Sequence, residues 1–414
     1  MPALNTAAAL ITLAALFSWV NHRFFRLPTT IALLLFSLAA SAAIIGLGTL
    51  GVHFDRVAEE LLAAVDFDEA LLHGMLSFLL FAGALHVDLA ELAQRKWAVG
   101  FLATLGVLIS TALVGVATWW LFGLLGHPIP LIYCLLFGAL ISPTDPIAVL
   151  AILKSAGAEA SLRIKMTGES LLNDGVGVVV FLVLLGIASG GHGATPQGVA
   201  LLFAQEVAGG ALFGLAIGYA AYRMLGSVDN YQVEVLITLA LVMGGYALAT
   251  TLHLSGPIAI VVAGLLIGNH GRRFAMSAKT TEHLDTFWEL IDEILNAALF
   301  VLIGLEVLLI SFDAAYGWAA ALAIPVVLGA RLASVGVAQL VPGLRREFPP
   351  YVIGILTWGG LRGGISIALA LSLPPGAERN ALITVTYVVV VFSILVQGLT
   401  LSRLLRRRGS EQML

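Results

Sequence analysis

Long apolar stretches alternate with short polar connections along almost the whole chain. Thirteen of them are predicted to be membrane spans, although several are shorter than the roughly 20 residues that a straight crossing needs. They cover residues 7–20, 29–50, 71–87, 97–125, 131–153, 167–189, 198–222, 231–252, 255–269, 291–311, 317–341, 350–374 and 379–402. The stretch 272–290 is more polar and is predicted to be a separate interfacial helix. The pattern therefore predicts an all-α, polytopic membrane protein.

The positions of the basic residues test this count independently, because inner loops of membrane proteins are enriched in lysine and arginine. If the N-terminus lies outside and the sides alternate, the inner loops hold seventeen of the 21 basic residues and the outer loops hold only Arg56 and Arg379. One span more or fewer would destroy this asymmetry. The sequence predicts thirteen spans in the cell (inner) membrane, with the N-terminus outside and the C-terminus in the cytoplasm.

Composition narrows the class of protein further. Only 11% of the residues are charged and 59% are hydrophobic, whereas typical soluble domains contain about 25% charged residues. The single cysteine, Cys134, excludes a disulfide framework and a multi-cysteine metal site. The connections are short, so residues 1–414 are expected to form one membrane unit without a soluble regulatory domain. No H-E-x-x-H or G-x-S-x-G motif is present, and we predict neither an enzyme, nor a cofactor, nor a nucleic-acid partner.

Two spans are interrupted. The fifth contains ISPTDP, in which two prolines each remove a backbone donor. Its first half-helix is predicted to end near Ser142 and its second to begin at Asp145, which can cap a helix that starts with proline. The twelfth contains GGLRGG, in which four glycines flank Arg362 and weaken the helix. Spans five and twelve run in opposite directions, and such a pair of breaks indicates an inverted-repeat transporter with its binding site near the midplane.

A polar cluster interrupts the sixth span. At about 100° per residue, Glu169, Ser170, Asn173 and Asp174 share one face of the helix. A carboxylate at this depth costs at least about 2.5 kcal/mol, so we expect a buried cluster that includes Asp145 and Arg362. Arg362 is predicted to pair with Glu169. For Glu169 and Ser170, simple capping of the helix near the inner surface is the alternative.

Arg331 lies inside the eleventh span and also needs a partner. Glu306 and Glu293 are the candidates that the sequence offers, and a structural role is expected for this arginine.

These residue types suit a small hard cation that alternates with a proton. Carboxylate, hydroxyl and carbonyl oxygens are the ligands that such ions take, and carbonyls freed at the break of the fifth span would complete the shell. Burial favours the protonated form of a carboxyl group, whereas a bound cation favours the ionised form. Proton and cation would then compete for one carboxyl group. A passive channel and a coupled symporter of an organic solute are the rival hypotheses.

The motifs SPTDP, GESLLNDG and GLRGG, in this order, resemble those of the NhaP-type sodium/proton antiporters of the monovalent cation:proton antiporter-1 family. The segments LFAGALHVDL (80–89) and LNAALFVLIGLEV (295–307) resemble the third and tenth spans of that family. The resemblance implies the NhaA/NhaP-like antiporter fold and a homodimer in the lipid bilayer. It also implies a core domain including 98–189 and 317–402 that moves like an elevator against a dimerisation domain formed by the remaining spans.

The resemblance also implies roles for single residues. Thr144, Asp145, Ser170 and Asp174 match ion ligands, and Asp174 matches the group that binds either the proton or the cation. Asn173, which is counted among the residues around the ion, matches the asparagine that marks the electroneutral branch. Glu169 and Arg362 match a buried ion pair, and Ala82 stands where some members have a glutamate ligand.

The function implied is electroneutral Na⁺/H⁺ exchange in sodium transport and pH homeostasis, with Li⁺ or K⁺ as other cargo. Exchange of K⁺ for H⁺ on the same scaffold is the alternative, and a cation-coupled solute symporter is the third.

Overall fold

The computed structural model describes residues 2–50, 67–145, 149, 153, 159–189, 196–310 and 314–411. Within these residues the ordered elements are helices and no strand is found. Each of the thirteen predicted spans contains helical residues, so the predicted all-α, polytopic architecture is confirmed. Eight helical segments of the described part are long and apolar enough to cross a membrane: Leu4–Phe25, Thr29–Gly48, Lys96–Leu124, Ala160–Ala188, Leu201–Leu225, Tyr231–Thr251, Gly317–Leu340 and Ala377–Leu405. The other predicted spans are broken, shorter or more polar.

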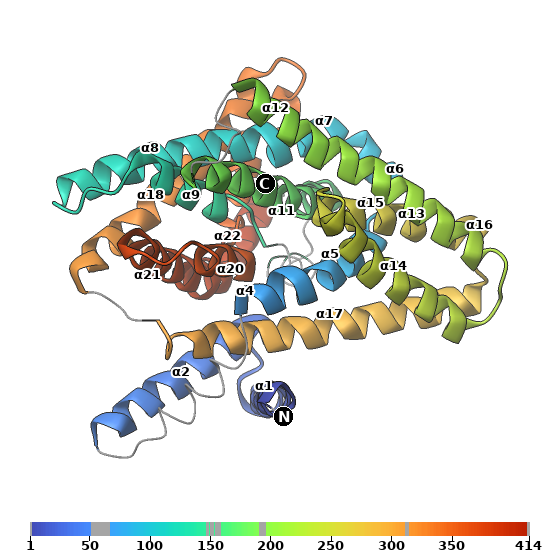
Figure 1. Ribbon diagram of the computed structural model, residues 1–414, viewed down its shortest axis with the longest axis horizontal. Coiled ribbons are helices and arrows are strands. Elements are labelled where there is room, and N and C mark those ends of the chain that lie inside the picture. Colours follow the sequence, from blue (N-terminus) through green and yellow to red (C-terminus); the bar gives the residue numbers. More distant parts are fainter. Residues whose placement is uncertain are drawn as a thin grey trace.

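One group of helices packs around the interrupted fifth and twelfth spans. α9 packs against α8, α11 and α20, while α18 packs against α8, α19 and α21 (Figure 1). The elements of this group are α6 (Leu89–Gln94), α7 (Lys96–Phe101), η3 (Leu102–Gly106), α8 (Val107–Leu124), α9 (Leu131–Ile141), α11 (Ala160–Ala188), α18 (Gly317–Val337), α19 (Pro350–Trp358), α20 (Gly364–Leu371), α21 (Ala377–Phe392), η9 (Ser393–Gln397) and α22 (Gly398–Glu411).

The other helices form a second group. α15 packs against α5, α13 and α14, and the long helix α17 packs against α1, α2, α5 and α14 along one side of the molecule (Figure 1). The elements of this group are α1 (Pro2–Val20), η1 (Asn21–Phe25), α2 (Thr29–Thr49), α4 (Phe67–Glu69), η2 (Ala70–Met75), α5 (Leu76–Leu85), α12 (Pro196–Ala204), η4 (Gln205–Gly209), α13 (Gly210–Leu225), α14 (Tyr231–Thr251), α15 (Gly256–Leu266), η5 (Ile267–Gly271), α16 (Arg272–Phe274) and α17 (Ala278–Glu306).

The prediction of a separate surface helix over 272–290 is wrong. After the single turn of α16, α17 begins at Ala278 and continues without a break through the tenth span to Glu306. The polar first half of α17 is amphipathic, and its apolar residues Leu284 and Trp288 are buried. The Trp288 ring lies 4.6 Å from that of Phe81, between ring centroids, and its indole N–H donates to Thr238 (3.1 Å). These contacts stabilise helical residues that precede the apolar stretch 291–311, from which the tenth span was predicted.

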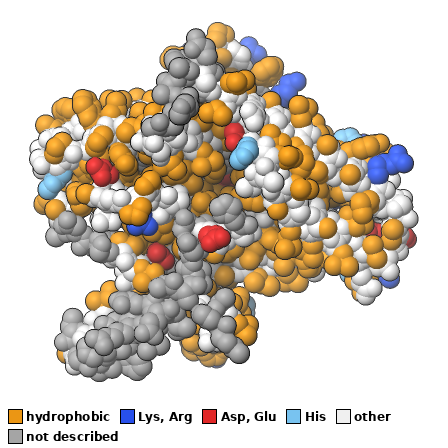
Figure 2. All heavy atoms as spheres, viewed as in Figure 1, with side chains coloured by type: hydrophobic (Ala, Val, Ile, Leu, Met, Phe, Trp, Pro, Cys, Tyr) orange, Lys and Arg blue, Asp and Glu red, His pale blue; other side chains and the backbone are white. Residues whose placement is uncertain are grey.

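The outer surface of the described residues is mostly apolar. Figure 2 shows hydrophobic side chains over most of the visible face and few charged ones. Large residues such as Leu212 and Leu236 are more than half exposed, although a water-soluble fold would bury many of them. Tryptophans stand exposed near helix ends, Trp120 in α8 and Trp318 in α18, as is typical where a membrane meets water.

Connections that the charge pattern assigns to the inner side also contact one another. Glu347, which follows α18, accepts ion pairs from Arg95 and from Lys165, each at 3.1 Å. On another part of the same predicted side, the Ser277 hydroxyl donates to Asp229 (2.9 Å). Both contacts join connections that the charge pattern places on one side, and the orientation of the chain in the membrane stays a prediction.

Candidate functional site

The fifth span is interrupted where the sequence predicts it. α9 ends at Ile141, and Ser142, Pro143, Thr144 and Asp145 continue as non-helical chain. The predicted second half-helix lies outside the described residues, apart from two single positions. Pro143 packs against α11 so closely that a Cβ atom on Gly177 would lie 2.2 Å from the proline ring. The glycine lets the break lie directly on the helix that carries the polar cluster.

The twelfth span is interrupted as well. α19 ends at Trp358, and α20 begins at Gly364 after five non-helical residues. The two breaks meet, because the Asp145 N–H donates to the Leu361 carbonyl (2.7 Å). A Cβ atom on Gly363 would lie only 2.3 Å from Oδ2 of Asp145. The carboxylate of one break therefore lies against the backbone of the other, and a side chain at 363 would displace it.

Arg362 is hydrogen-bonded to the backbone at the break of the fifth span and is not paired with Glu169. Its guanidinium is buried and donates from Nη1 to the carbonyls of Ser142 and Pro143, the latter at 2.9 Å. The predicted Glu169–Arg362 pair is therefore wrong. The last carbonyls of a helix lack partners within it, and a cation at the C-terminal end also offsets the helix dipole. Both carbonyls therefore accept a hydrogen bond from a cationic group, and the idea that carbonyls freed here complete an ion's shell stays a prediction.

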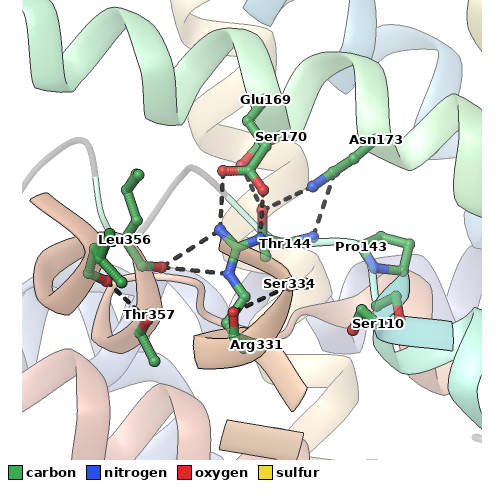
Figure 3. A network of polar contacts seen from close by, with 12 residues as sticks. Ser110, Pro143, Thr144, Glu169, Ser170, Asn173, Arg331, Ser334, Leu356 and Thr357 are labelled. Atoms are coloured by element: carbon green, nitrogen blue, oxygen red, sulfur yellow. Dashed lines mark hydrogen bonds and ion pairs between the residues drawn. The ribbon is translucent and has the colours of Figure 1, made fainter. Parts of the chain in front are cut away.

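The partner of Glu169 is Arg331 (Figure 3). Nη1 of Arg331 donates to one carboxylate oxygen of Glu169 and Nη2 donates to the other (2.9 Å), which makes a two-pronged ion pair between α18 and α11. The same guanidinium also donates to the Leu356 carbonyl at the end of α19 (3.3 Å from Nη2). Both side chains are at least 95% buried. The pairings predicted for Arg331, with Glu306 or Glu293, are therefore wrong, because a closer carboxylate faces it across the bundle.

Glu169 and Ser170 do not cap their helix. α11 begins at Ala160, with Glu159 as the residue at its cap, so the two residues lie in the third turn. The polar residues before 167 concealed this earlier start. The alternative of simple capping is excluded for these residues, and their burial needs the internal partners that the structure supplies.

Hydrogen bonds tie the polar face of α11 to the break in the fifth span. The Thr144 hydroxyl lies 2.9 Å from that of Ser170 and accepts a hydrogen bond from the side-chain amide nitrogen of Asn173 (3.0 Å). The backbone N–H of Thr144 donates to the side-chain oxygen Oδ1 of Asn173 (3.4 Å). Figure 3 shows Ser170 and Asn173 reaching Thr144 from the same helix. All three side chains are buried. Ser170 and Asn173 therefore position Thr144.

Asp145 and Asp174 face a common cavity of about 60 Å³. Among the described residues its polar lining consists of Thr144, Asp145, Asp174 and Ser366, and the remaining lining consists of apolar side chains and glycines. Leucines contribute most of that apolar surface: Leu71, Leu76, Leu79, Leu80, Leu171 and Leu299. The two predicted exchange carboxylates are thus brought together, with Thr144 beside them.

Sequence reasoning missed Ser366. The residue follows the GLRGG motif by two positions and lies in the first turn of α20. A single serine in an apolar helix ordinarily bonds to its own backbone, so only the position of the break gives a signal.

Ala82 does not line this cavity. It packs with Phe81, Leu85 and Trp288 in a separate apolar cluster of the second group of helices. From α5 the cavity receives Leu76, Leu79 and Leu80 instead. The third span therefore presents an apolar surface to the two carboxylates.

The chain is similar to known membrane proteins over almost its full length. The family model described as "Sodium/hydrogen exchanger, transmembrane" matches residues 10–407. The Na(+)/H(+) antiporter NhaP of Pseudomonas aeruginosa is 53% identical over 409 residues, which cover 98% of this chain and 96% of that protein. The Na(+)/H(+) antiporter NhaH of Halobacillus aidingensis is 36% identical and covers 92% of both. In fold, the sodium proton antiporter MjNhaP1 of Methanocaldococcus jannaschii superposes with a TM-score of 0.75 at 18% identity, covering 98% of this chain and 99% of that one.

Proposed function

Because this chain belongs to the transmembrane sodium/hydrogen exchanger family, we propose that it exchanges Na⁺ for H⁺ across a membrane as a secondary active antiporter. One observation carries the assignment to residues: Asp145 and Asp174 face one small cavity at the point where two broken helices meet. Carboxylate and hydroxyl oxygens at such a place suit an alkali cation. Thr144 supplies the hydroxyl beside the two carboxylates.

Competition at Asp174 couples the two ions. Asp174 is buried, and in this scheme its carboxyl group holds a proton when no cation is bound. A cation that enters the cavity favours the ionised form and displaces the proton. Asp145 lies at the same cavity and adds negative charge for the cation. Since one group holds either ion, each crossing of a cation in one direction is matched by a proton in the other.

The same scheme makes the exchange electroneutral. Asp174 carries one proton or one monovalent cation, so its net charge is the same on both journeys. Residue 173, next to it, is a neutral asparagine whose amide is bonded to Thr144. The membrane potential, worth about 2.3 kcal/mol per charge per 100 mV, then does no net work on the cycle.

The size of the cavity supports an ion over an organic solute. Its volume of about 60 Å³ is several-fold smaller than the roughly 300–1,000 Å³ of pockets for small molecules. A water molecule needs about 10–15 Å³ of such space, so the cavity has room for a cation with a few waters. A cation-coupled symporter of larger solutes is disfavoured, whereas K⁺ remains the alternative cargo to Na⁺.

We further propose a division of the chain into a moving core, which includes 98–189 and 317–402, and a dimerisation domain made of the other spans. In support, the cavity lies between the two groups, since its polar residues come from the first and Leu71, Leu76 and Leu299 from the second. The protein is proposed to be a homodimer in the cell (inner) membrane, with its N-terminus outside. The excess of basic residues on one side supports that orientation.

The test is proton flux in sealed proteoliposomes that contain the purified protein. Outward gradients of Na⁺, Li⁺ or K⁺ are applied in turn, with the voltage either free or clamped by an ionophore for an ion that is not under test. We expect Na⁺ to drive proton uptake at a rate that the clamp does not change. A faster response to K⁺ would reassign the cargo, and cation flux without proton counterflow would identify a channel.

A further inference from the structure

Ser366 lines the cavity shared by Asp145 and Asp174, and its hydroxyl has no hydrogen-bond partner among the described residues. Ser366 is 1% exposed to solvent and is one of the four polar residues that line the cavity. No hydrogen bond of its hydroxyl to any described residue is found, whereas the serines buried elsewhere in the bundle are bonded, for example Ser37 to the Leu33 carbonyl (2.7 Å) and Ser334 to the Arg331 carbonyl (3.0 Å). A buried hydroxyl without a partner is uncommon, because its desolvation is then uncompensated.

The break in the twelfth span explains why this hydroxyl is free. A serine inside a helix usually donates to the carbonyl three or four residues earlier. For Ser366 these are the carbonyls of Gly363 and Arg362, which precede the first residue of α20 at Gly364. The Arg362 carbonyl lies in the non-helical break and Gly363 has extended backbone, so Ser366 lacks the regular preceding turn, and it lines the cavity together with Asp145, Asp174 and Thr144.

The opposite wall of the cavity supplies no competing ligand among the described residues. The third span contributes leucines, and Ala82 lies in another cluster. The carbonyls of Ser142 and Pro143 already accept hydrogen bonds from the Arg362 guanidinium, whose positive charge disfavours a cation beside them. A bare alkali cation needs several oxygens around it, and two carboxylates with one threonine leave room for another.

We infer that Ser366 supplies a hydroxyl ligand to the transported cation, completing a shell to which the third span contributes no carboxylate. This inference rests on the proposed exchange function. A hydroxyl is neutral, so it strengthens cation binding without adding a second group that competes for the proton. Ser366 therefore sets the affinity for the cation and its preference among alkali ions, while Asp174 sets the response to protons.

The experiment compares Ser366→Ala with the wild type in proteoliposomes, with proton flux measured against Na⁺ and Li⁺ concentration at several pH values. We expect the KM for the cation to rise about tenfold, because the cation loses one ligand. The rate at saturating cation should stay within about twofold of the wild-type rate. The ratio of the KM values for Na⁺ and Li⁺ should also change. Ser366→Thr, which keeps the hydroxyl, should restore most of the affinity.

Ser372→Ala is the matched control, because Ser372 ends the same helix and donates to the Leu369 carbonyl (3.0 Å) away from the cavity. An unchanged KM in Ser366→Ala, or a loss of rate and melting temperature without a change in KM, would overturn the inference. If Ser366→Ala does not fold, Ser366→Cys decides, since a thiol has nearly the same shape but is a poor ligand for hard cations. If the wild type itself shows no cation-driven proton flux, the proposed function fails instead.

Discussion

The two walls of the cavity that Asp145 and Asp174 line differ in chemistry. One wall carries Thr144, Asp145, Asp174 and Ser366, and it belongs to the helices around the two breaks. Behind it the polar groups are fixed by hydrogen bonds and by the Glu169–Arg331 pair. The other wall, from η2, α5 and α17, presents leucine side chains, which have no directional bonds to make.

The difference shows how one site can combine fixed oxygen ligands with an interface along which helices can slide. Ion selection needs oxygens held in place, because a small displacement of a ligand costs binding energy. The proposed movement of one group of helices past the other needs an interface without hydrogen bonds, because such bonds would have to break at each step. A leucine surface opposite a bonded polar surface meets both needs, and the following substitutions test each wall.

The largest effect is expected from Asp174→Asn. The amide has a similar shape but carries no charge and does not take up a proton, so cation-driven proton flux should fall to the level of protein-free liposomes. Flux is measured in the assay above, and folding by size-exclusion chromatography. Asp229→Asn, at a surface loop, is the matched control and should exchange normally. Wild-type exchange in Asp174→Asn would reject competition at this residue.

The bonded support of the polar wall is tested by comparing Arg331→Ala with Arg362→Ala. The first leaves the Glu169 carboxylate buried without its partner, which costs about 3–5 kcal/mol. The second leaves two carbonyls without a donor, each at about 1–3 kcal/mol, whereas the first adds one such loss, at the Leu356 carbonyl, to the unpaired carboxylate. The melting temperature in detergent should therefore be lower for Arg331→Ala than for Arg362→Ala. The reverse order would show that Glu169 depends on Arg362 after all.

The meeting point of the two breaks is tested by Gly363→Ala. The added Cβ atom has to displace the Asp145 carboxylate, which would lie 2.3 Å away. A shift of about 1 Å in a reacting group can reduce a rate by about a hundredfold, so exchange should fall steeply while the melting temperature changes little. Gly336→Ala in α18, where a Cβ atom meets nothing within 4 Å, should leave exchange unchanged. Equal activity of the two variants would show that Asp145 need not lie against Gly363.

The smallest effects distinguish the two walls directly. Thr144→Val removes the hydroxyl that bonds Ser170 and Asn173, and exchange should fall about tenfold for the loss of such a bond. Leu79→Met on the apolar wall keeps the volume and the character of the side chain, so exchange should stay within about twofold. Both are measured as proton flux against Na⁺ concentration. A comparable loss in the two variants would remove the distinction between the walls.

Much of the architecture could be predicted because the membrane leaves the sequence few options. Backbone groups must be bonded within helices at this depth, so apolar runs mark spans, and prolines or clustered glycines mark breaks. The expected end of the first half-helix of the fifth span near Ser142, and the weakening of the twelfth span by the glycines around Arg362, follow from that rule. The convergence of Asp145 and Asp174 follows from the cost of isolated carboxylates in the same surroundings.

Pairings between distant helices could not be predicted. Glu169 had two arginines within reach of its helix, and which one it meets depends on how α18 and α19 are placed, not on residue type. The continuation of α17 depends on the contact of Trp288 with another helix. Ser366 could not be identified as a free hydroxyl, because the sequence does not show which hydrogen-bond acceptors lie near its side chain. Composition reveals which groups need partners, and only packing assigns them.

The grip of Arg362 on the carbonyls of Ser142 and Pro143 has a consequence for the whole cycle. Both bonds come from a guanidinium, which does not lose its proton in proteins, so they do not depend on the protonation of Asp174. If exchange proceeds as proposed, we expect the unwound segment to keep its backbone conformation when a cation replaces the proton on Asp174.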